Sequence, residues 1–331
     1  MATYLRAIEE IQWAREATPG TDLPTTSKIL VTEFNATPDS ILYKPQPIRG
    51  LWQRNRGFET VVARGANWSM AGPLTYEQAP NWLNYAVANV AAPTGLSPYT
   101  WAHVRNPAAV PSLATFTLER KENDGSTAIG HAWHYCVLTK LTISWAENEP
   151  LMFAAEGFSR RRQTETLTPA ITLPSVEIPP TQLAALSIDT TFAGLGGTPI
   201  TSQILSGSIE INTGAYPIKT LDARSDLDFN TIGFNADEAS VNLSITSLLG
   251  AQYATELAAA EAGTLRAIQI IVTGTSSRSF KIGGIFKYAV PELFEFGDLD
   301  GSKIVGMELE ETTDGTNLLT ATVINGVSAL I

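Results

Sequence analysis

The chain has 331 residues, of which 44% are hydrophobic and 17% charged, and its formal net charge is −11 at pH 7. A chain of this length usually forms two domains, each with a sizeable core. The acidic balance argues against a protein that grips the phosphates of nucleic acid, because such a protein needs a basic face. No apolar run approaches the roughly 20 residues of a membrane span, and residues 1–20 lack the apolar segment of a signal peptide.

Residues 1–27 are expected to form an N-terminal arm. The breakers Thr18-Pro19-Gly20-Thr21 interrupt any regular element, and residues 9–17 fit either a short helical turn or extended chain. Such an arm is either disordered or held in place by a neighbour. Residues 28–35 then read as a strand.

Residues 36–57 form no predicted element. A loop of this length inside a domain is unusual and tends to be functional. Its basic residues are Lys44, Arg49, Arg54 and Arg56. In an acidic chain, these side chains favour docking on an acidic patch of a neighbour. A merely flexible surface loop is the alternative.

Short strands around one helix are predicted for the rest of the first half. The expected strands cover residues 58–69, 99–104 and 114–120. The helix is expected from Thr75 to Val90, because Trp82, Leu83 and Val87 recur at helical spacing. We interpret this apolar stripe as core packing, with the helix plugging one end of the β structure.

Residues 129–162 carry the clearest pattern in the chain. Val137, Leu141 and Ile143 follow a period of two, and the polar turn at residues 147–150 precedes a returning strand. This pattern predicts a β-hairpin.

The Pro-rich residues 166–181 are expected to be a stiff linker. Beyond it, strands are predicted over residues 185–190, 206–212, 240–246, 266–273, 280–289, 293–296, 304–311 and 318–325, with a helix over 249–262. Residues 282–311 echo the hairpin, and residues 240–262 repeat the strand-then-helix order of 67–89. Repetition at this scale predicts a duplicated domain, each copy large enough for its own core.

The sequence contains no motif for catalysis, cofactors or metals that we can defend. Cys136 is the only cysteine, and we interpret it as a buried small side chain. His131 and His134 would point to opposite faces of a strand, which makes a poor metal pair. Residues 298–309 depart from a calcium-binding loop at two required positions. We therefore expect no enzyme activity, no cofactor and no metal site.

The ordered features of residues 8–165 resemble the tail tube protein (major tail protein) of long-tailed bacteriophages. The matching stretches are Trp13-Ala14-Arg15-Glu16-Ala17-Thr18-Pro19-Gly20-Thr21, Arg54-Asn55-Arg56-Gly57, Gly72-Pro73-Leu74-Thr75-Tyr76, the helix to Val90, Tyr99-Thr100-Trp101, residues 114–118 and the hairpin ending at Gly157-Phe158. The resemblance implies an Hcp-like, mainly β fold. Its two tandem tail-tube-like β-sandwich or barrel domains, each with one flanking α-helix, would cover residues 28–165 and 182–331.

The resemblance also implies a structural virion protein. Six small β domains form each ring of such a tube, and two domains per chain would give trimer rings. The implied partners are other copies of the chain, the tape measure protein in the lumen, the tail terminator and distal tail proteins, and genomic DNA that passes without specific binding. The implied location is the virion tail, with assembly in the host cytoplasm and no membrane. An acidic lumen would repel phosphate.

Candidate contacts between subunits or rings come from the same resemblance, in which arms reach an adjacent subunit and the long loop stacks on the next ring. They are Trp13, Arg15, Lys44, Arg49, Trp52, Arg54 and Arg56. The alternative is a non-polymerising β-rich tail-tip, baseplate or decoration protein. A β-sandwich hydrolase is a third hypothesis, for which the sequence nominates no residues.

Overall fold

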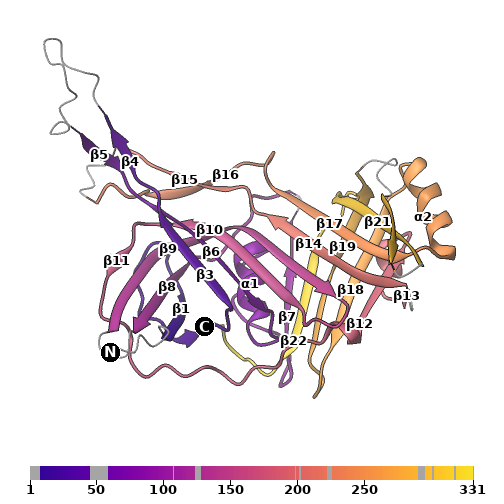
Figure 1. Ribbon diagram of the computed structural model, residues 1–331, viewed down its shortest axis with the longest axis horizontal. Helices are drawn as coiled ribbons and strands as arrows, with labels where there is room; N and C mark the ends of the chain where they lie inside the picture. Colours follow the sequence, from indigo (N-terminus) through magenta and orange to yellow (C-terminus); the bar gives the residue numbers. More distant parts are fainter. Residues whose placement is uncertain are drawn as a thin grey trace, which may run out of the picture.

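A computed structural model describes residues 8–44, 59–106, 108–123, 128–197, 199–200, 203–221, 226–289, 295–299, 302–316 and 318–330. This part of the chain is mainly antiparallel β structure with two α-helices, α1 (Ala79–Ala86) and α2 (Ala251–Glu261) (Figure 1). The predicted mainly β fold is confirmed.

The strands fall into two sets along the chain. The first set is β1 (Ile8–Arg15), β2 (Ser27–Lys28), β3 (Glu33–Pro38), β4 (Ile41–Tyr43), β5 (Thr60–Ala63), β6 (Ala66–Pro73), β7 (Tyr99–Val104), β8 (Phe116–Asn123), β9 (Ala128–Ala146), β10 (Met152–Ser159) and β11 (Gln163–Thr164). The second set is β12 (Ala184–Asp189), β13 (Pro199–Ile200), β14 (Ile204–Asn212), β15 (Ala215–Ile218), β16 (Thr231–Phe234), β17 (Ser240–Leu248), β18 (Arg266–Thr273), β19 (Ser279–Tyr288), β20 (Glu295–Leu299), β21 (Ser302–Glu311) and β22 (Thr320–Asn325). Below, "first half" and "second half" refer to these two sets.

The two halves have the same order of strand pairing. In the first half, β3–β6–β10–β9 form one layer, and β9 continues into a second layer with β8 and β1. In the second half, β14–β17–β21–β20 form one layer, and β19–β18–β12 form the other. The register repeats as well: Met70 lies opposite Ala155 just as Leu243 lies opposite Leu309.

One strand pair merges the two halves into a continuous sheet. β14 pairs antiparallel with the later part of β9, from Ser206 opposite Ala146 to Asn212 opposite Lys140. The result is an eight-stranded sheet in the order β3–β6–β10–β9–β14–β17–β21–β20, which we call the long sheet. In the other layer, β7 of the first half pairs with β22 of the second half.

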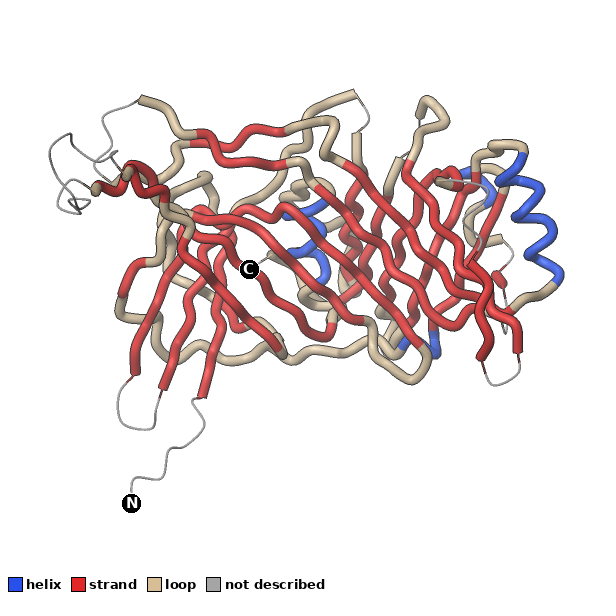
Figure 2. Tube along the Cα trace, turned by 45° about the horizontal axis from the view of Figure 1, so that its top comes forward, coloured by secondary structure: helices blue, strands red, loops and turns tan. Residues whose placement is uncertain are grey.

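The core fills the space between the layers. Alternating apolar residues on the strands face inward, and the main apolar cluster of the described residues extends through both halves. The β9–β14 and β7–β22 pairs bring both sets of apolar faces together. α1 lies inside this core with all eight residues buried, whereas α2 lies at the end of the molecule remote from β1 (Figure 2).

The expected N-terminal arm is part of the sheet instead. Residues Ile8–Arg15 form β1, which pairs along its whole length with β8 of the same chain. β2 then returns to pair with β1. Both faces of β1 are covered by its own chain, so this segment is not free to reach a neighbour; residues 1–7 lie outside the described residues.

Other sequence predictions are confirmed more closely. The hairpin predicted over residues 129–162 is β9–β10, with its turn at residues 147–150. The second predicted helix is α2. The first is shorter than predicted, because residues 76–78 form a turn and α1 begins beyond them. Pro80 lies in its first turn, where a missing N–H group costs little.

An ionic clamp ties the halves to the Pro-rich segment. Arg278 of the second half places its Nε 2.9 Å from Glu77 Oε1 and its Nη1 2.7 Å from Glu177 Oε2. The Glu177 N–H donates to Glu77 Oε2 at 2.8 Å. The segment predicted as a linker is therefore bonded to both halves at this point.

Candidate functional site

The most distinctive surface is the side of the long sheet that faces away from the core. Strand residues alternate, so that Ile143, Ile209 and Leu309 are buried while their neighbours in sequence point outward. The outward side chains, which we call the polar face, are Glu33, Asn35, Thr37, Asn67, Ser69, Lys140, Thr142, Ser144, Glu156, Ser206, Ser208, Glu210, Asn212, Asn242, Ser244, Thr246, Glu308 and Glu310, together with Lys287 at the end of β19, where β19 also pairs with β21. They come from both halves and are small or acidic with few exceptions.

The polar face carries five carboxylates and two lysines in the set just named. One lysine is neutralised at the junction, where Lys140 Nζ lies 2.6 Å from Glu210 Oε2. The hydrogen bond from Lys140 holds the pKa of Glu210 below its ordinary value against the opposing effect of burial. Glu156, Glu308 and Glu310 are exposed, so the surface is acidic overall.

Two shallow grooves cross the polar face at related places. One has a volume of about 360 Å³ and is lined by Asn35, Asn67, Ser69 and Glu156 among others. The other has about 330 Å³ and is lined by Ser208, Glu210, Asn242, Ser244, Glu308 and Glu310 among others. Among the described residues, neither groove is lined by histidine, cysteine, lysine or arginine, so neither places a histidine or lysine base beside its serine hydroxyls, or a cation that could bind phosphate.

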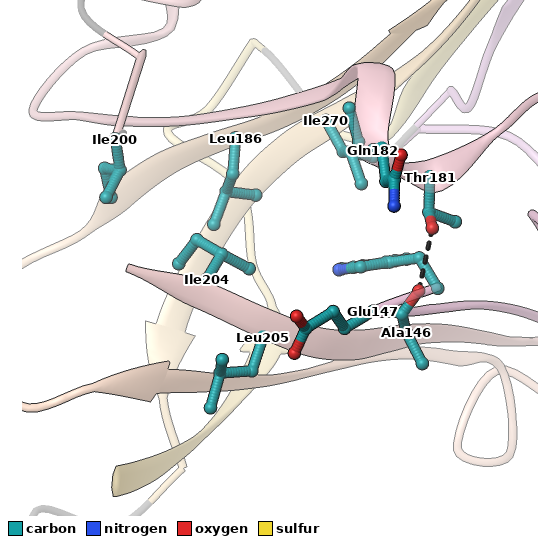
Figure 3. A pocket seen from close by; sticks show the side chains of 11 residues that line it. Ala146, Glu147, Thr181, Gln182, Leu186, Ile200, Ile204, Leu205 and Ile270 are labelled. Carbon is teal, nitrogen blue, oxygen red and sulfur yellow. Dashed lines mark hydrogen bonds between the residues drawn. The ribbon is translucent and has the colours of Figure 1, made fainter. Parts of the chain in front are cut away.

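A third pocket, of about 230 Å³, lies at the C-terminal end of β9, beside Ala146 and Glu147 (Figure 3). Its walls are Leu186, Ile200, Ile204, Leu205 and Ile270, with Trp145 beside them. The Thr181 hydroxyl donates to the Ala146 carbonyl at 2.7 Å, closing one side. Among the described residues of the lining, Glu147 is the single carboxylate, and acid–base chemistry needs paired groups.

Buried ionisable groups elsewhere are engaged in structural bonds. Glu16 accepts from the N–H groups of Gly20 and Tyr135 and from the hydroxyls of Thr115 and Thr117, at 2.7–3.1 Å. Burial raises the pKa of the Cys136 thiol well above its ordinary value, which disfavours the reactive thiolate. Among the described residues, no group of three or more His, Cys, Asp or Glu side chains is arranged to hold a metal ion.

The residues expected to contact other subunits do not gather in one place. Trp13 is 0% exposed and packs 5.0 Å from Trp82, ring centroid to centroid, so it is a core residue and not a contact residue. Arg15 is half-buried and donates from Nη2 to Asn89 Oδ1 at 2.5 Å. Lys44 is exposed just after β4. Arg49, Trp52, Arg54 and Arg56 lie outside the described residues.

The β4–β5 hairpin carries an apolar surface that was not predicted from the sequence. Ile41, Leu42, Tyr43 and Val62 are 40–57% exposed there. The signal was available, because Ile41-Leu42-Tyr43 is an apolar run inside a segment otherwise rich in proline and charge. Such a run on one hairpin is unusual for a free surface.

The architecture and this surface define a class: a β-rich protein with two halves of like pairing order joined through one long acidic sheet. The family model for phage tail tube proteins matches residues 9–321, and the chain belongs to that family. It is thus a structural component of a phage virion tail. A search among curated proteins found no match. Among the described residues, neither helix is long and apolar enough to cross a bilayer.

Proposed function

We propose that three copies of this chain close into a ring, that rings stack into the tail tube, and that the polar face lines the lumen. The observation that carries the proposal is the β9–β14 junction. It joins two halves of like pairing order, side by side, through backbone hydrogen bonds.

The same junction can form between chains. Within the described residues, β3 pairs with β6 alone and β20 with β21 alone, so each end of the long sheet has a free edge. β14 is the counterpart of β3, and the later part of β9 is the counterpart of β20. A second copy can therefore place its β3 against β20 as β14 lies against β9. Repeating this step gives head-to-tail contacts that close a ring and leave no edge strand in the joined long sheets.

The number of chains follows from the duplicated pairing order. The family resemblance implies six β units in each ring, and each chain supplies two. Three chains would join their long sheets into one closed barrel, in which strands tilt and the inner faces turn toward the axis. Axial contacts between rings would leave the stack open-ended.

The composition of the polar face suits a conduit for DNA. Serine, threonine, asparagine and glutamate offer no cluster of cations to bind phosphates, and the carboxylates repel them. DNA would pass without specific binding after the tape measure protein leaves the lumen. Tail terminator and distal tail proteins would contact the two ends of the tube, and assembly would take place in the host cytoplasm.

Electron microscopy of the negatively stained protein, before and after concentration, tests the proposal. We expect hollow tubes or rings with six lobes in end view, and a ring mass of three chains of 35.6 kDa each. Rings of six chains would contradict the trimer. Particles that remain single chains even after purified tail-tip complex is added as an initiator would contradict polymerisation.

A further inference from the structure

The β15–β16 hairpin of the second half is anchored on the first half. Phe229, which leads into β16, is 1% exposed, and its ring lies 4.9 Å from Tyr135 and 5.3 Å from Phe158, centroid to centroid. The Arg160 guanidinium lies 5.0 Å from the Tyr135 ring centroid. The hairpin thus leans back over the half that precedes it and covers the end of β10 (Figure 1).

Polar contacts fix the same anchor. The Arg161 N–H donates to Asp228 Oδ1 at 3.1 Å, and the Arg64 N–H donates to the Leu227 carbonyl at 2.9 Å. Residues 227–229 therefore fill the space between the end of β10 and the base of the β4–β5 hairpin.

The corresponding place beside the second half is open. The end of β21 corresponds to the end of β10, and the base of β15–β16 corresponds to the base of β4–β5. A groove of about 340 Å³ lies there. Its lining comes from the β7–β8 connection of the first half, with Val110 and Pro111, and from the second half, with Phe234, Ala236 and Leu318. Most of the lining is apolar, and the ion pair of Arg105 with Glu311 lies at one side. Val110 is 70% exposed, so this part of the lining is accessible to a partner.

The counterpart of the anchored hairpin is β4–β5, and its apolar side chains have no cover within the described chain. Each hairpin joins corresponding strands: β4–β5 connects β3 to β6, and β15–β16 connects β14 to β17. The sequences entering the second strand of each are alike, Phe58-Glu59-Thr60-Val61 and Phe229-Asn230-Thr231-Ile232. Phe58 itself lies outside the described residues. Tyr43 and Ile41 are each more than half exposed.

We propose that the β4–β5 hairpin of one chain docks in the groove beside the second half of a neighbouring copy in the same ring. The inference rests on the proposed ring, and it assigns the hairpin to a lateral contact. The docked hairpin would repeat between chains the anchor that β15–β16 makes within one chain. Apolar burial would supply the stabilisation, at roughly 25 cal/mol per Å² of apolar surface covered.

Site-specific photo-crosslinking tests the contact. Tyr43 is replaced by benzoylphenylalanine in the full chain, the protein is concentrated or seeded with tail-tip complex, and adducts are mapped by mass spectrometry. We expect links between chains to the peptides that contain Val110, Phe234 or Leu318. The matched control is Tyr216→benzoylphenylalanine on the anchored hairpin, which is 44% exposed and should give links within one chain only.

A groove variant supplies the second arm. Val110→Glu should lower the yield of the Tyr43 link at least tenfold without unfolding the chain, because this side chain is exposed. Leu96→Glu, at another exposed apolar residue (87% exposed), should leave the yield unchanged. Chains that associate while the links map outside the groove, or while Val110→Glu has no effect, would overturn this contact and leave the ring intact. Absence of any association would contradict the proposed function as well.

Discussion

The two helices occupy corresponding places and are packed by different means. α1 lies among aromatic side chains: the Trp82 ring is 4.6 Å from Phe153 and the Tyr85 ring 4.4 Å from Phe116, centroid to centroid. α2 meets its sheet through a buried polar group instead. Arg266 Nε lies 2.9 Å from Glu256 Oε2, and the Tyr288 hydroxyl donates to the same oxygen at 2.7 Å.

The difference follows from what comes next along the molecule. Beyond α1 stands the second half, whose β22 pairs with β7 and closes the core around the helix. No described segment packs against the outer side of α2, where Ala254, Thr255 and Ala258 are exposed. The same order of strand pairing is therefore compatible with an aromatic core around α1 and a polar contact under α2. Backbone pairing fixes the layers, and side chains only have to fill the space between them.

The largest effect on this comparison is expected from Trp82→Ala. The side chain is 0% exposed and contacts several rings, so its removal should lower the free energy of unfolding by about 4 kcal/mol. Urea denaturation followed by tryptophan fluorescence and circular dichroism measures this. The control is Thr255→Ala on the exposed side of α2, expected within about 0.5 kcal/mol of the parent. Equal losses for both variants would mean that α1 is not enclosed.

A slightly smaller loss is expected from Arg266→Met at the α2 interface. This change leaves the buried Glu256 carboxylate without its cation and should cost about 3 kcal/mol. The double variant Arg266→Met/Glu256→Gln should recover most of that loss, since no buried charge then remains. Thermal and urea unfolding of the single and double variants measure both values. A double variant as unstable as the single one would refute the assigned pair.

Arg278→Ala addresses the clamp between the halves, with an expected cost of about 1.5 kcal/mol because the side chain is partly exposed. Burial alone would raise the pKa of Glu177, but hydrogen bonds from Thr275 and Arg278 and the Arg278 charge outweigh it and lower that pKa. A carboxyl with a lowered pKa stabilises the fold above its unfolded pKa and loses this contribution as the pH falls through the folded value. The gap between parent and variant should therefore narrow below about pH 4. A gap that stays constant from pH 7 to pH 3 would contradict the role of Glu177.

The smallest effect on stability is expected on the polar face, where the two halves have the same kind of side chain at corresponding positions. Glu156 and Glu310 hold corresponding exposed positions, and changing either to lysine should alter stability by no more than about 0.5 kcal/mol. If this face lines a lumen, Glu156→Lys/Glu310→Lys tubes should retain DNA at low salt and release it as salt rises. Retention is measured by sedimenting assembled tubes with short duplex DNA. Equal retention of DNA by parent and double-variant tubes would mean that Glu156 and Glu310 do not line the lumen.

Local pattern was sufficient for the elements that carry a clear period. The strand predicted over residues 99–104 has the bounds of β7, and that over residues 266–273 has the bounds of β18. β1 was missed because Gln12 and Ala14 are buried along with Ile11 and Trp13, so the segment has no alternation. Its partner, β8, lies more than 100 residues away in sequence. β15 contains Pro217, which hides a strand from a pattern search.

The candidate site was only partly predictable for a related reason. Alternation predicts that Thr142 and Ser144 face outward, but it does not predict that β9 pairs with β14. Trp13 was assigned to a subunit contact on the strength of a resemblance. The structure places it in the core, because α1 and β8 supply aromatic partners that no local rule could anticipate. Adjacency of distant strands, more than residue type, determines where this surface lies.

β9 and β14 meet at the junction between the halves, which we call a seam, and they belong to one chain. This has a consequence for the rate of ring assembly. In a ring of three such chains, half of the six seams would be intramolecular and would form at any dilution. Only the other three would depend on encounter between molecules, so a ring would be assembled from three molecules in place of six. An intramolecular seam also benefits from the high effective concentration of its tethered partners. It can therefore tolerate sequence changes that would dissociate the same strand pair between separate chains. The two halves are then free to diverge in sequence, as their helices have done.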